Sequence, residues 1–360
     1  MPYTSRALLL TSALLCSTAS AQPDVREQFN QNYRAYQQAV EKHEDFQEIE
    51  RYAKLAYEQG RAVFGEQTEN TANLIINYAK SIAFDNKEEA LNLLDRAIAT
   101  LEKIYGDNAV ELIDSYMLKA DWLLPKKDLT AREYISKSLE IAKQSGNKLL
   151  ESTVYFEAAK TLNIVGDYSR AKSYLRHADE INQQHLPKDS VHRLTVDLWV
   201  AELLAARKQN NNAIEKLNQV VAVFDEKLDF DHPLELVAHS RLVGLYERLG
   251  KRELATRHCV AIAKMKPWQD DIEQTPLYRI EPIYPTRAAR ARKEGWVDLE
   301  FTVTPEGFVE DIKVLDKEHG EMFVKNSIKA LKDWRYAPKF VDGEAVSAKT
   351  SVRLAFKMSR

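Results

Sequence analysis

The chain has 360 residues, with 54 acidic and 51 basic side chains and a formal net charge of −3. Hydrophobic residues make up 44% of it, which is enough apolar surface for the cores of two domains. No dense run of basic residues interleaved with aromatic ones occurs, so the composition argues against a nucleic-acid-binding protein.

The first 21 residues predict an export signal. Arg6 precedes an apolar run over residues 7–16, and Ala-Ser-Ala ends at Ala21, a pattern typical of a signal peptide that is cut there. The apolar run is shorter than the roughly 20 residues that cross a bilayer, which disfavours a retained membrane anchor. Bulky Leu15 disfavours a lipoprotein signal at Cys16. Cleavage would leave Cys259 as the single cysteine, so stability would rest on buried apolar surface rather than on disulfides.

Residues 22–266 predict repeated helical hairpins. Few Gly or Pro interrupt the segment, and apolar residues recur at three- and four-residue intervals. Gly65 and Gly106 are expected at helix ends. Small or apolar residues mark a longer period of 40 to 42 residues: Ile49, Ala90, Ala131, Ala171, Ala213 and Ala255.

This period resembles an elongated tetratricopeptide repeat, a helix–turn–helix unit whose small residues let paired helices pack closely. We expect an all-α solenoid of about six hairpins, right-handed, with a concave surface for a protein or peptide. An unrelated helical bundle is the alternative, and the regular spacing argues against it. Residues 267–276, acidic and bounded by Pro267 and Pro276, predict a short linker that keeps the next domain close.

Residues 277–360 predict a small α+β domain. A short basic helix is expected over residues 285–293, with Pro at its first turn. Apolar residues alternate with polar ones over residues 297–303 and again after the turn at Pro305-Glu306-Gly307, which predicts a β-hairpin. A helix follows over residues 321–334, and a long final strand over residues 346–356 comes after the Asp342-Gly343 turn. Trp334 and Tyr336 are expected to pack the helix on the sheet.

This αββαβ order closely resembles the C-terminal domain of the TonB family, the periplasmic end of the energy transducer that serves outer-membrane receptors. The motifs that carry the resemblance are Tyr284-Pro285, Gly295-Trp296-Val297, Pro305-x-Gly307 and Trp334-Arg335-Tyr336-x-Pro338. They keep their order and distance over about residues 276–358, under a quarter of the chain.

The last strand is expected to be a sheet edge whose unpaired backbone groups accept a partner strand. The resemblance implies that this partner is the "TonB box" near a receptor's N-terminus, and that the segment before the Tyr-Pro helix takes part. Glu281 stands where the transducers have a glutamine, which speaks against ordinary TonB-box specificity. The edge could instead dimerise or be covered. The expected partner-binding residues are Arg279, Ile280, Glu281, Val346, Ala348, Thr350, Val352, Arg353 and Leu354.

No arrangement of residues predicts catalysis. The sequence lacks a glycine-rich phosphate loop and a Gly-x-Ser-x-Gly motif. Cys259 occupies a helix-packing position and is expected to be a buried structural thiol. His185 and His192 are separated by Pro187 and lack the spacing of metal ligands. We therefore expect no enzymatic activity, no metal and no cofactor.

The favoured function is a periplasmic adaptor of a TonB-type transport system. Its repeats would hold one protein, such as a component of a TonB–ExbB–ExbD complex, while the C-terminal domain contacts an outer-membrane receptor, a transducer or the cell wall. Three alternatives stay open: an inner-membrane-anchored transducer that retains its N-terminal segment, an enzyme or small-ligand binder using a groove in the repeats, and a TonB-like fold used for another assembly. The oligomeric state is not determined by the sequence.

Overall fold

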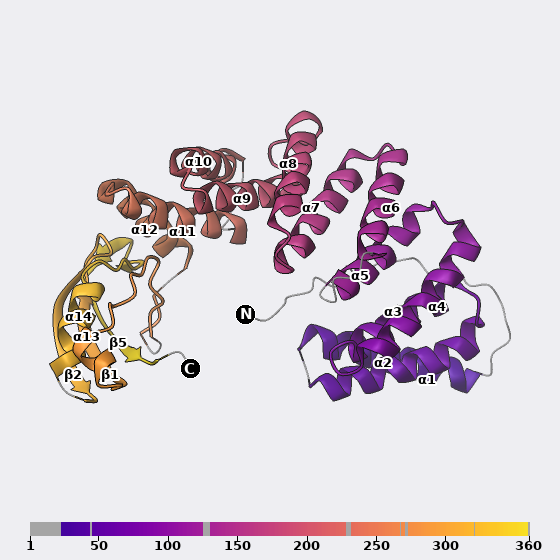
Figure 1. The fold of residues 1–360 in the computed structure, drawn as a ribbon, viewed down its shortest axis with the longest axis horizontal. Helices are drawn as coiled ribbons and strands as arrows, with labels where there is room; N and C mark the ends of the chain where they lie inside the picture. Colours follow the sequence, from indigo (N-terminus) through magenta and orange to yellow (C-terminus); the bar gives the residue numbers. More distant parts are fainter. Residues whose placement is uncertain are drawn as a thin grey trace. The chain divides into compact units, whose positions relative to one another are not determined.

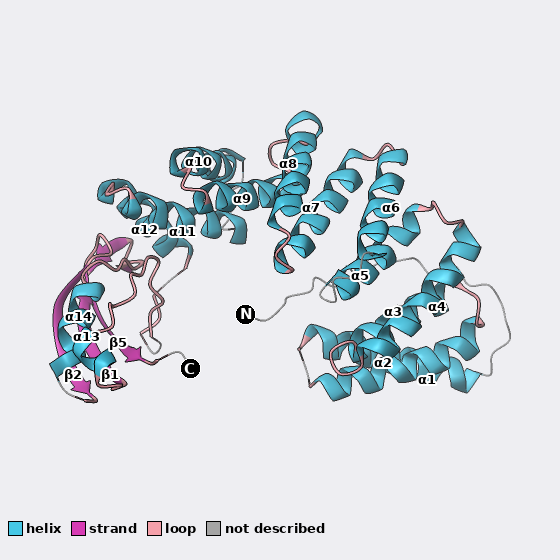
Figure 2. Ribbon diagram, in the orientation of Figure 1, coloured by secondary structure: helices cyan, strands magenta, loops and turns pink. Residues whose placement is uncertain are grey.

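The structure is a computed structural model that describes residues 23–43, 45–124, 130–227, 232–266, 268–270, 273–319 and 321–358. The predicted signal peptide and linker residues 267, 271 and 272 lie outside these ranges. Between Pro23 and Met265 the described elements are all helices, and every described strand follows later (Figures 1 and 2). The chain forms two compact units that divide between Ala171 and Lys172. Within the described ranges, no helix has the length and apolar character needed for a membrane crossing.

The first unit is a succession of antiparallel helices. It contains α1 (Pro23–Glu41), α2 (Phe46–Phe64), α3 (Glu69–Ile82), α4 (Lys87–Tyr105), a 3-10 turn η1 (Val110–Leu112), α5 (Ile113–Leu123), α6 (Thr130–Gln144), α7 (Lys148–Ile164) and the start of α8 (Tyr168–His185). Each helix from α1 to α6 packs against the helix that follows it in the chain. Helices α2 to α6 therefore each pack between two helices that are adjacent in the chain, as in stacked repeats.

The second unit continues the pattern with the rest of α8, α9 (Val191–Ala206), α10 (Asn210–Lys227), α11 (Pro233–Arg248) and α12 (Arg252–Met265). The periodic small residues lie on the even-numbered helices, and Ala90, Ala131, Ala213 and Ala255 have no exposed surface. Because alanine lets helix backbones approach closely, these positions fix the packing of each hairpin. The predicted tetratricopeptide-like helical fold is confirmed.

Local sequence also sets where the helices begin and end. The side chains of Thr68, Asn86 and Ser190 each accept a hydrogen bond from a backbone N–H in the first turn of the helix that follows. Gly65 and Gly106 end α2 and α4 with φ of 89° and 84°, a region of backbone conformation that favours glycine. Both glycines were predicted at helix ends, and the structure confirms them.

The C-terminal domain, residues 277–358, has the expected order of elements with one addition. It comprises α13 (Thr286–Arg290), β1 (Gly295–Val303), β2 (Val309–Lys317), α14 (Glu321–Leu331), β3 (Lys339–Val341), β4 (Glu344–Val346) and β5 (Ala348–Phe356). The three long strands form an antiparallel sheet in the order β2-β1-β5, and β3 and β4 form a separate two-stranded ribbon. The predicted fold class, helical repeats followed by a small α+β domain, is confirmed.

One face of the sheet and one face of α14 make the core of this domain. Val297, Leu299 and Phe301 alternate along β1 with half-exposed residues and are buried, as the pattern of the sequence predicts. Trp334 and Tyr336 are also buried, in the same apolar cluster as Phe323 of α14. Their predicted role in packing the helix exit on the sheet is confirmed.

The final strand differs from its predicted extent. We expected one strand over residues 346–356, but Val346 belongs to β4 and pairs with Lys339, while β5 begins at Ala348. Asp342 and Gly343 both have positive φ, 52° and 84°, and close a tight hairpin between β3 and β4. That turn pairs residues 344–346 with β3, and Ser347 separates them from β5, which pairs with β1.

Candidate functional site

β5 is an edge strand. Its nine residues pair in unbroken register with β1, from Ala348 opposite Val303 to Phe356 opposite Gly295. Among the described residues, β1 is the only strand beside it. The other side of β5 therefore carries a row of backbone N–H and C=O groups without a strand partner, which is the surface that strand addition needs.

β2, the opposite edge, is less suited to the same role. Its pairing with β1 shifts register between Asp298 and Leu299 and again between Glu300 and Thr302. Asp311 within β2 also has a positive φ of 51°. Such irregularities twist a strand and hinder pairing with a further strand. The regular edge of this sheet is β5.

The predicted contact residues on β5 divide between its two faces. Val352 and Leu354 are buried on the side of α14, at 8% and 5% exposure, and Thr350 is half-buried between them and Ala348. Arg353 is exposed on the opposite face. A partner strand would therefore meet the backbone of β5 and the exposed side chains of its outer face, rather than Val352 and Leu354 themselves.

Arg353 is held by its neighbours on β1. Its Nε and Nη2 donate to the two carboxylate oxygens of Asp298 at 2.7 and 2.6 Å, and its guanidinium lies 3.9 Å from the centroid of the Trp296 ring. The paired guanidinium lowers the pKa of the Asp298 carboxyl. The charge of Arg353 is therefore paired with Asp298, and one flat face of its guanidinium lies against Trp296.

The predicted contact residues before the Tyr-Pro helix lie against Trp334. The Trp334 Nε1 donates to the carbonyl oxygen of Ile280 at 2.9 Å, and the Arg279 guanidinium lies 5.4 Å from the Trp334 ring centroid. Arg279 Nε also donates to Glu281 Oε1 at 2.7 Å. In the described parts of the chain, no hydrogen bond or ion pair joins these residues to β5.

A different segment of the linker reaches β5. Glu273, which sequence reasoning did not single out, lines a hollow of about 220 Å³ together with Asp298, Leu315, Ser351, Val352 and Arg353. The linker is attached to the domain on the N-terminal side of this residue: Trp268 packs on the core, and Lys339 Nζ lies 2.7 Å from Asp270 Oδ1. The acidic composition of the linker was visible in the sequence, but its course along the domain was not.

Arg335 joins the C-terminal domain to the last helical hairpin, α11 and α12. The side chain is 1% exposed and forms an ion pair with Glu247 of α11, which is 3% exposed. Its Nη2 donates to Thr256 Oγ1 of α12 at 2.8 Å and to the Glu306 carbonyl at 2.7 Å. The guanidinium also lies 3.9 Å from the Phe308 ring centroid. Sequence reasoning treated this arginine only as part of a motif.

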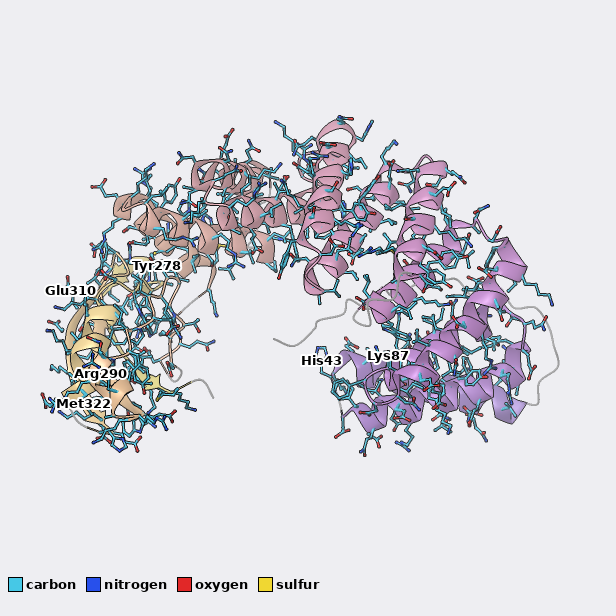
Figure 3. The ribbon with its side chains drawn as sticks, viewed as in Figure 1. His43, Lys87, Tyr278, Arg290, Glu310 and Met322 are labelled. Atoms are coloured by element: carbon cyan, nitrogen blue, oxygen red, sulfur yellow. The ribbon has the colours of Figure 1, made fainter. Side chains whose placement is uncertain are left out.

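The same junction has an apolar part. Val243, Cys259 and Ile262 of the last hairpin form a buried cluster against Leu277 and Tyr278. Tyr278 lies at the end of the C-terminal domain beside this hairpin, while Arg290 and Met322 lie at the opposite end (Figure 3).

Cys259 has the predicted structural role. It is fully buried in the apolar part of the junction, and burial raises the pKa of its thiol to about 12. A thiol with that pKa is protonated at neutral pH, whereas nucleophilic cysteines depend on the thiolate. The structure therefore gives Cys259 a packing role.

A histidine pair in the last hairpin was missed by sequence reasoning. His239 Nδ1 and His258 Nδ1 are 2.7 Å apart, and Glu235 Oε1 lies 3.6 Å from His239 Nε2. Burial, followed by the neighbouring His239 and Arg257, lowers the pKa of His258 to about 4. The two histidines lie on α11 and α12, 19 positions apart, so no short-range sequence spacing predicts the pair. In the described ranges, no three His, Cys, Asp or Glu side chains are grouped as metal ligands.

Comparison with known proteins matches the C-terminal domain to one family. Residues 280–358 fit the family described as "Gram-negative bacterial TonB protein C-terminal". The chain is 31% identical over 91 residues to the TonB protein of Pseudomonas aeruginosa, covering 25% of this chain and 27% of that protein. It is 40% identical over 62 residues to TonB of Escherichia coli, covering 17% of this chain and 26% of that protein. The match thus spans about a quarter of the length of these relatives.

Solved structures resemble the two parts of the chain separately. The solution structure of the Pseudomonas aeruginosa TonB C-terminal domain is 34% identical and aligns with 25% of this chain and 92% of its own, with a TM-score of 0.22. The crystal structure of BtubC from P. vanneervenii is 17% identical and aligns with 70% of this chain and 96% of its own, with a TM-score of 0.47.

Proposed function

We propose that the protein is a non-enzymatic adaptor of a TonB-type envelope transport system. The match of residues 280–358 to the TonB C-terminal family supports this proposal. Its C-terminal domain would bind an outer-membrane receptor, or a related partner, by adding a strand of that partner to β5. The helical repeats would bind a second protein, such as a component of a TonB–ExbB–ExbD complex. Export by a cleaved signal peptide would place the protein in the periplasm.

The observation that carries this proposal is the regular, one-sided pairing of β5. Strand addition obtains its affinity from main-chain hydrogen bonds and its selectivity from the side chains beside them. β5 offers nine consecutive residues without a register break, whereas β2 is interrupted twice. The family match and the free edge point to the same mode of binding.

Site-specific photocrosslinking in the intact cell envelope tests the proposal. A photoreactive residue in place of Lys349, exposed on β5, is expected to capture a TonB-dependent receptor. The matched control carries the same residue in place of Lys313, exposed on β2, and is expected to capture none. Equal capture from both strands, or capture of no envelope protein from β5, would contradict the proposal.

Proline substitutions at two successive positions separate strand addition from general unfolding. Neighbouring backbone N–H groups of a strand point to opposite sides. Of Ser351→Pro and Val352→Pro, one therefore removes a donor to β1 and the other removes a donor on the free edge. The variant whose circular dichroism stays native reports on the free edge, and it is expected to lose the crosslink from Lys349.

The alternative function is an inner-membrane-anchored TonB-type transducer that retains its N-terminal segment. The two proposals differ in the N-terminus of the protein isolated from the envelope. Sequencing that begins at Gln22 would support the exported adaptor, and an intact N-terminus in the membrane fraction would support the anchored transducer.

A further inference from the structure

Among the described residues that line the hollow beside β5, the carboxylate of Glu273 forms no ion pair, unlike that of Asp298. Asp298 and Arg353 compensate each other through two hydrogen bonds, at 2.7 and 2.6 Å. Glu273 is exposed, and no ion pair or hydrogen bond to its carboxylate occurs within the described residues. Arg353 also has its face covered by Trp296. An incoming side chain therefore meets an available carboxylate but no available cation.

Described residues on both sides of Glu273 in the chain contact the C-terminal domain. Toward the N-terminus, Trp268 packs on the core of the C-terminal domain and Asp270 pairs with Lys339. Toward the C-terminus, the Leu277 N–H donates to the Arg335 carbonyl oxygen at 2.7 Å.

We propose that this hollow selects a lysine or arginine in the strand that adds to β5. The inference rests on the proposed function and specifies the chemistry of its partner: an extended segment with one basic side chain directed to the outer face of the sheet. Its cationic group would pair with Glu273.

An acidic side chain of the partner strand does not fit the same position. A carboxylate from the partner would have to displace Asp298 from Arg353 and would also face Glu273. Like charges placed against each other weaken association, and this contributes to the choice of partner. A single exposed ion pair changes affinity by up to about fivefold, so we expect a preference of that size.

The test measures binding of labelled peptides to the full-length protein by fluorescence anisotropy. The peptides match the nine-residue length of β5 and alternate Val with Thr between Gly-Ser ends. Each threonine in turn is replaced by Lys, Gln or Glu. At one position, the Lys peptide is expected to bind up to about fivefold more tightly than the Gln peptide. The preference should shrink between about 50 mM and about 500 mM salt.

Variants of Glu273 decide whether this carboxylate is the selector. Glu273→Gln should abolish the preference for Lys, and Glu273→Lys should reverse it in favour of the Glu peptide. The matched control, Glu310→Gln, removes an exposed carboxylate of β2 that does not line the hollow and should leave the preference unchanged. An undiminished preference for Lys in Glu273→Gln would overturn the proposal.

The same experiment distinguishes failure of this inference from failure of the proposed function. If all peptides bind equally well and the natively folded proline variant of β5 binds none, strand addition stands and selection by Glu273 is wrong. If no peptide binds in any register, or if that proline variant binds as well as the unsubstituted protein, strand addition fails and this inference fails with it.

Discussion

Arg335 shows how one residue can join two parts of a chain. Its guanidinium is almost completely buried, and so is the carboxylate of Glu247. Taking an ionised side chain out of water costs several kcal/mol, which the opposite charge and the hydrogen bonds to Thr256 and the Glu306 carbonyl offset here. The effect of the pair on the free energy of unfolding is therefore largest when one partner is removed and the other stays buried and charged.

Glu247→Ala should lower the free energy of unfolding by about 3–5 kcal/mol, because it leaves the buried Arg335 without its counter-ion. The double variant Glu247→Leu with Arg335→Met should cost less than the single one, since it removes both charges. Urea denaturation of the unsubstituted protein, the single variant and the double variant measures these free energies of unfolding. Arg241→Ala is the control: Arg241 of α11 is 57% exposed and pairs with Glu202 of α9, and losing it should cost under about 1 kcal/mol. A Glu247→Ala variant as stable as this control would contradict the interpretation.

Gly307 is constrained by its backbone and by its surroundings. Its φ is 83°, and an added Cβ would lie 2.2 Å from the Tyr336 carbonyl oxygen. Gly307→Ala should therefore lower the thermal stability, with a cost of more than about 1 kcal/mol. Gly343→Ala is a matched control, since Gly343 has nearly the same φ, 84°, with nothing within 4 Å of its added Cβ. Equal melting temperatures for the two variants would show that the close approach to Tyr336 is unimportant.

At the scale of elements, α11 and α12 are held together by side chains as well as by apolar packing. His258 of α12 lies against His239 of α11, and its ring stacks on Tyr246 at a centroid distance of 5.6 Å. A neutral pair can share one proton between the two facing nitrogens, but two imidazolium rings would repel each other. The hairpin should therefore respond to acid.

The free energy of unfolding should fall as the pH is lowered from about 6.5 toward 4. The pKa of His258 is about 4 in the folded protein against an ordinary value of 6.5, so the unfolded chain takes up this proton first. We expect a loss on the order of 2 kcal/mol between pH 7 and pH 4.5, measured by urea denaturation. His258→Gln should remove that part of the loss. His185→Gln, at an exposed helix end, should not change it.

The two edge strands of the sheet, β5 and β2, differ in how well they can pair with a further strand. β5 is continuous and pairs evenly, and its large apolar residues Val352, Leu354 and Phe356 lie on the covered face. β2 has register shifts and exposes most of its residues on both faces. A strand with such irregularities is a poor template for a further strand. The proposed binding mode follows from this difference between β5 and β2.

At the scale of the molecule, the second compact unit combines repeat helices with the C-terminal domain. The buried ion pair of Arg335 and the apolar cluster around Cys259 connect the two within this unit. Parts of a protein that share a buried core tend to open together. The last hairpin thus supports the domain that carries β5.

Hydrogen exchange of the full-length protein should show this coupling. The most slowly exchanging amides of α12 and of β1 should have the same free energy of opening, because both elements depend on the shared junction. Glu247→Ala should lower both values together, while Arg241→Ala, which removes an exposed ion pair with Glu202 outside the junction, should leave them nearly unchanged. A loss of protection confined to α12 would show that the C-terminal domain is independent of the hairpin.

The sequence by itself determined the class of the fold and the order of its elements. The period of the small residues predicted helices packed in hairpins, because close helix contacts tolerate only small side chains there. The alternation over residues 297–303 predicted β1, since successive side chains of a strand point to opposite faces. Local patterns of this kind depend on neighbours within a few residues, so they can be read without coordinates. The boundary of the final strand could not, because the turn at Asp342-Gly343 makes residues 344–346 pair with β3.

The tertiary structure alone decided which distant residues meet. Arg335 and Glu247 are 88 positions apart, and His239 and His258 lie on different helices. Glu273 lines a hollow together with residues of β5, whereas Arg279 to Glu281 lie beside Trp334 instead. Such contacts depend on how the chain returns to itself, and in one sequence no periodicity records that path. For this protein, sequence patterns specified the two kinds of domain, and only long-range packing specified their junction and the surroundings of the free strand.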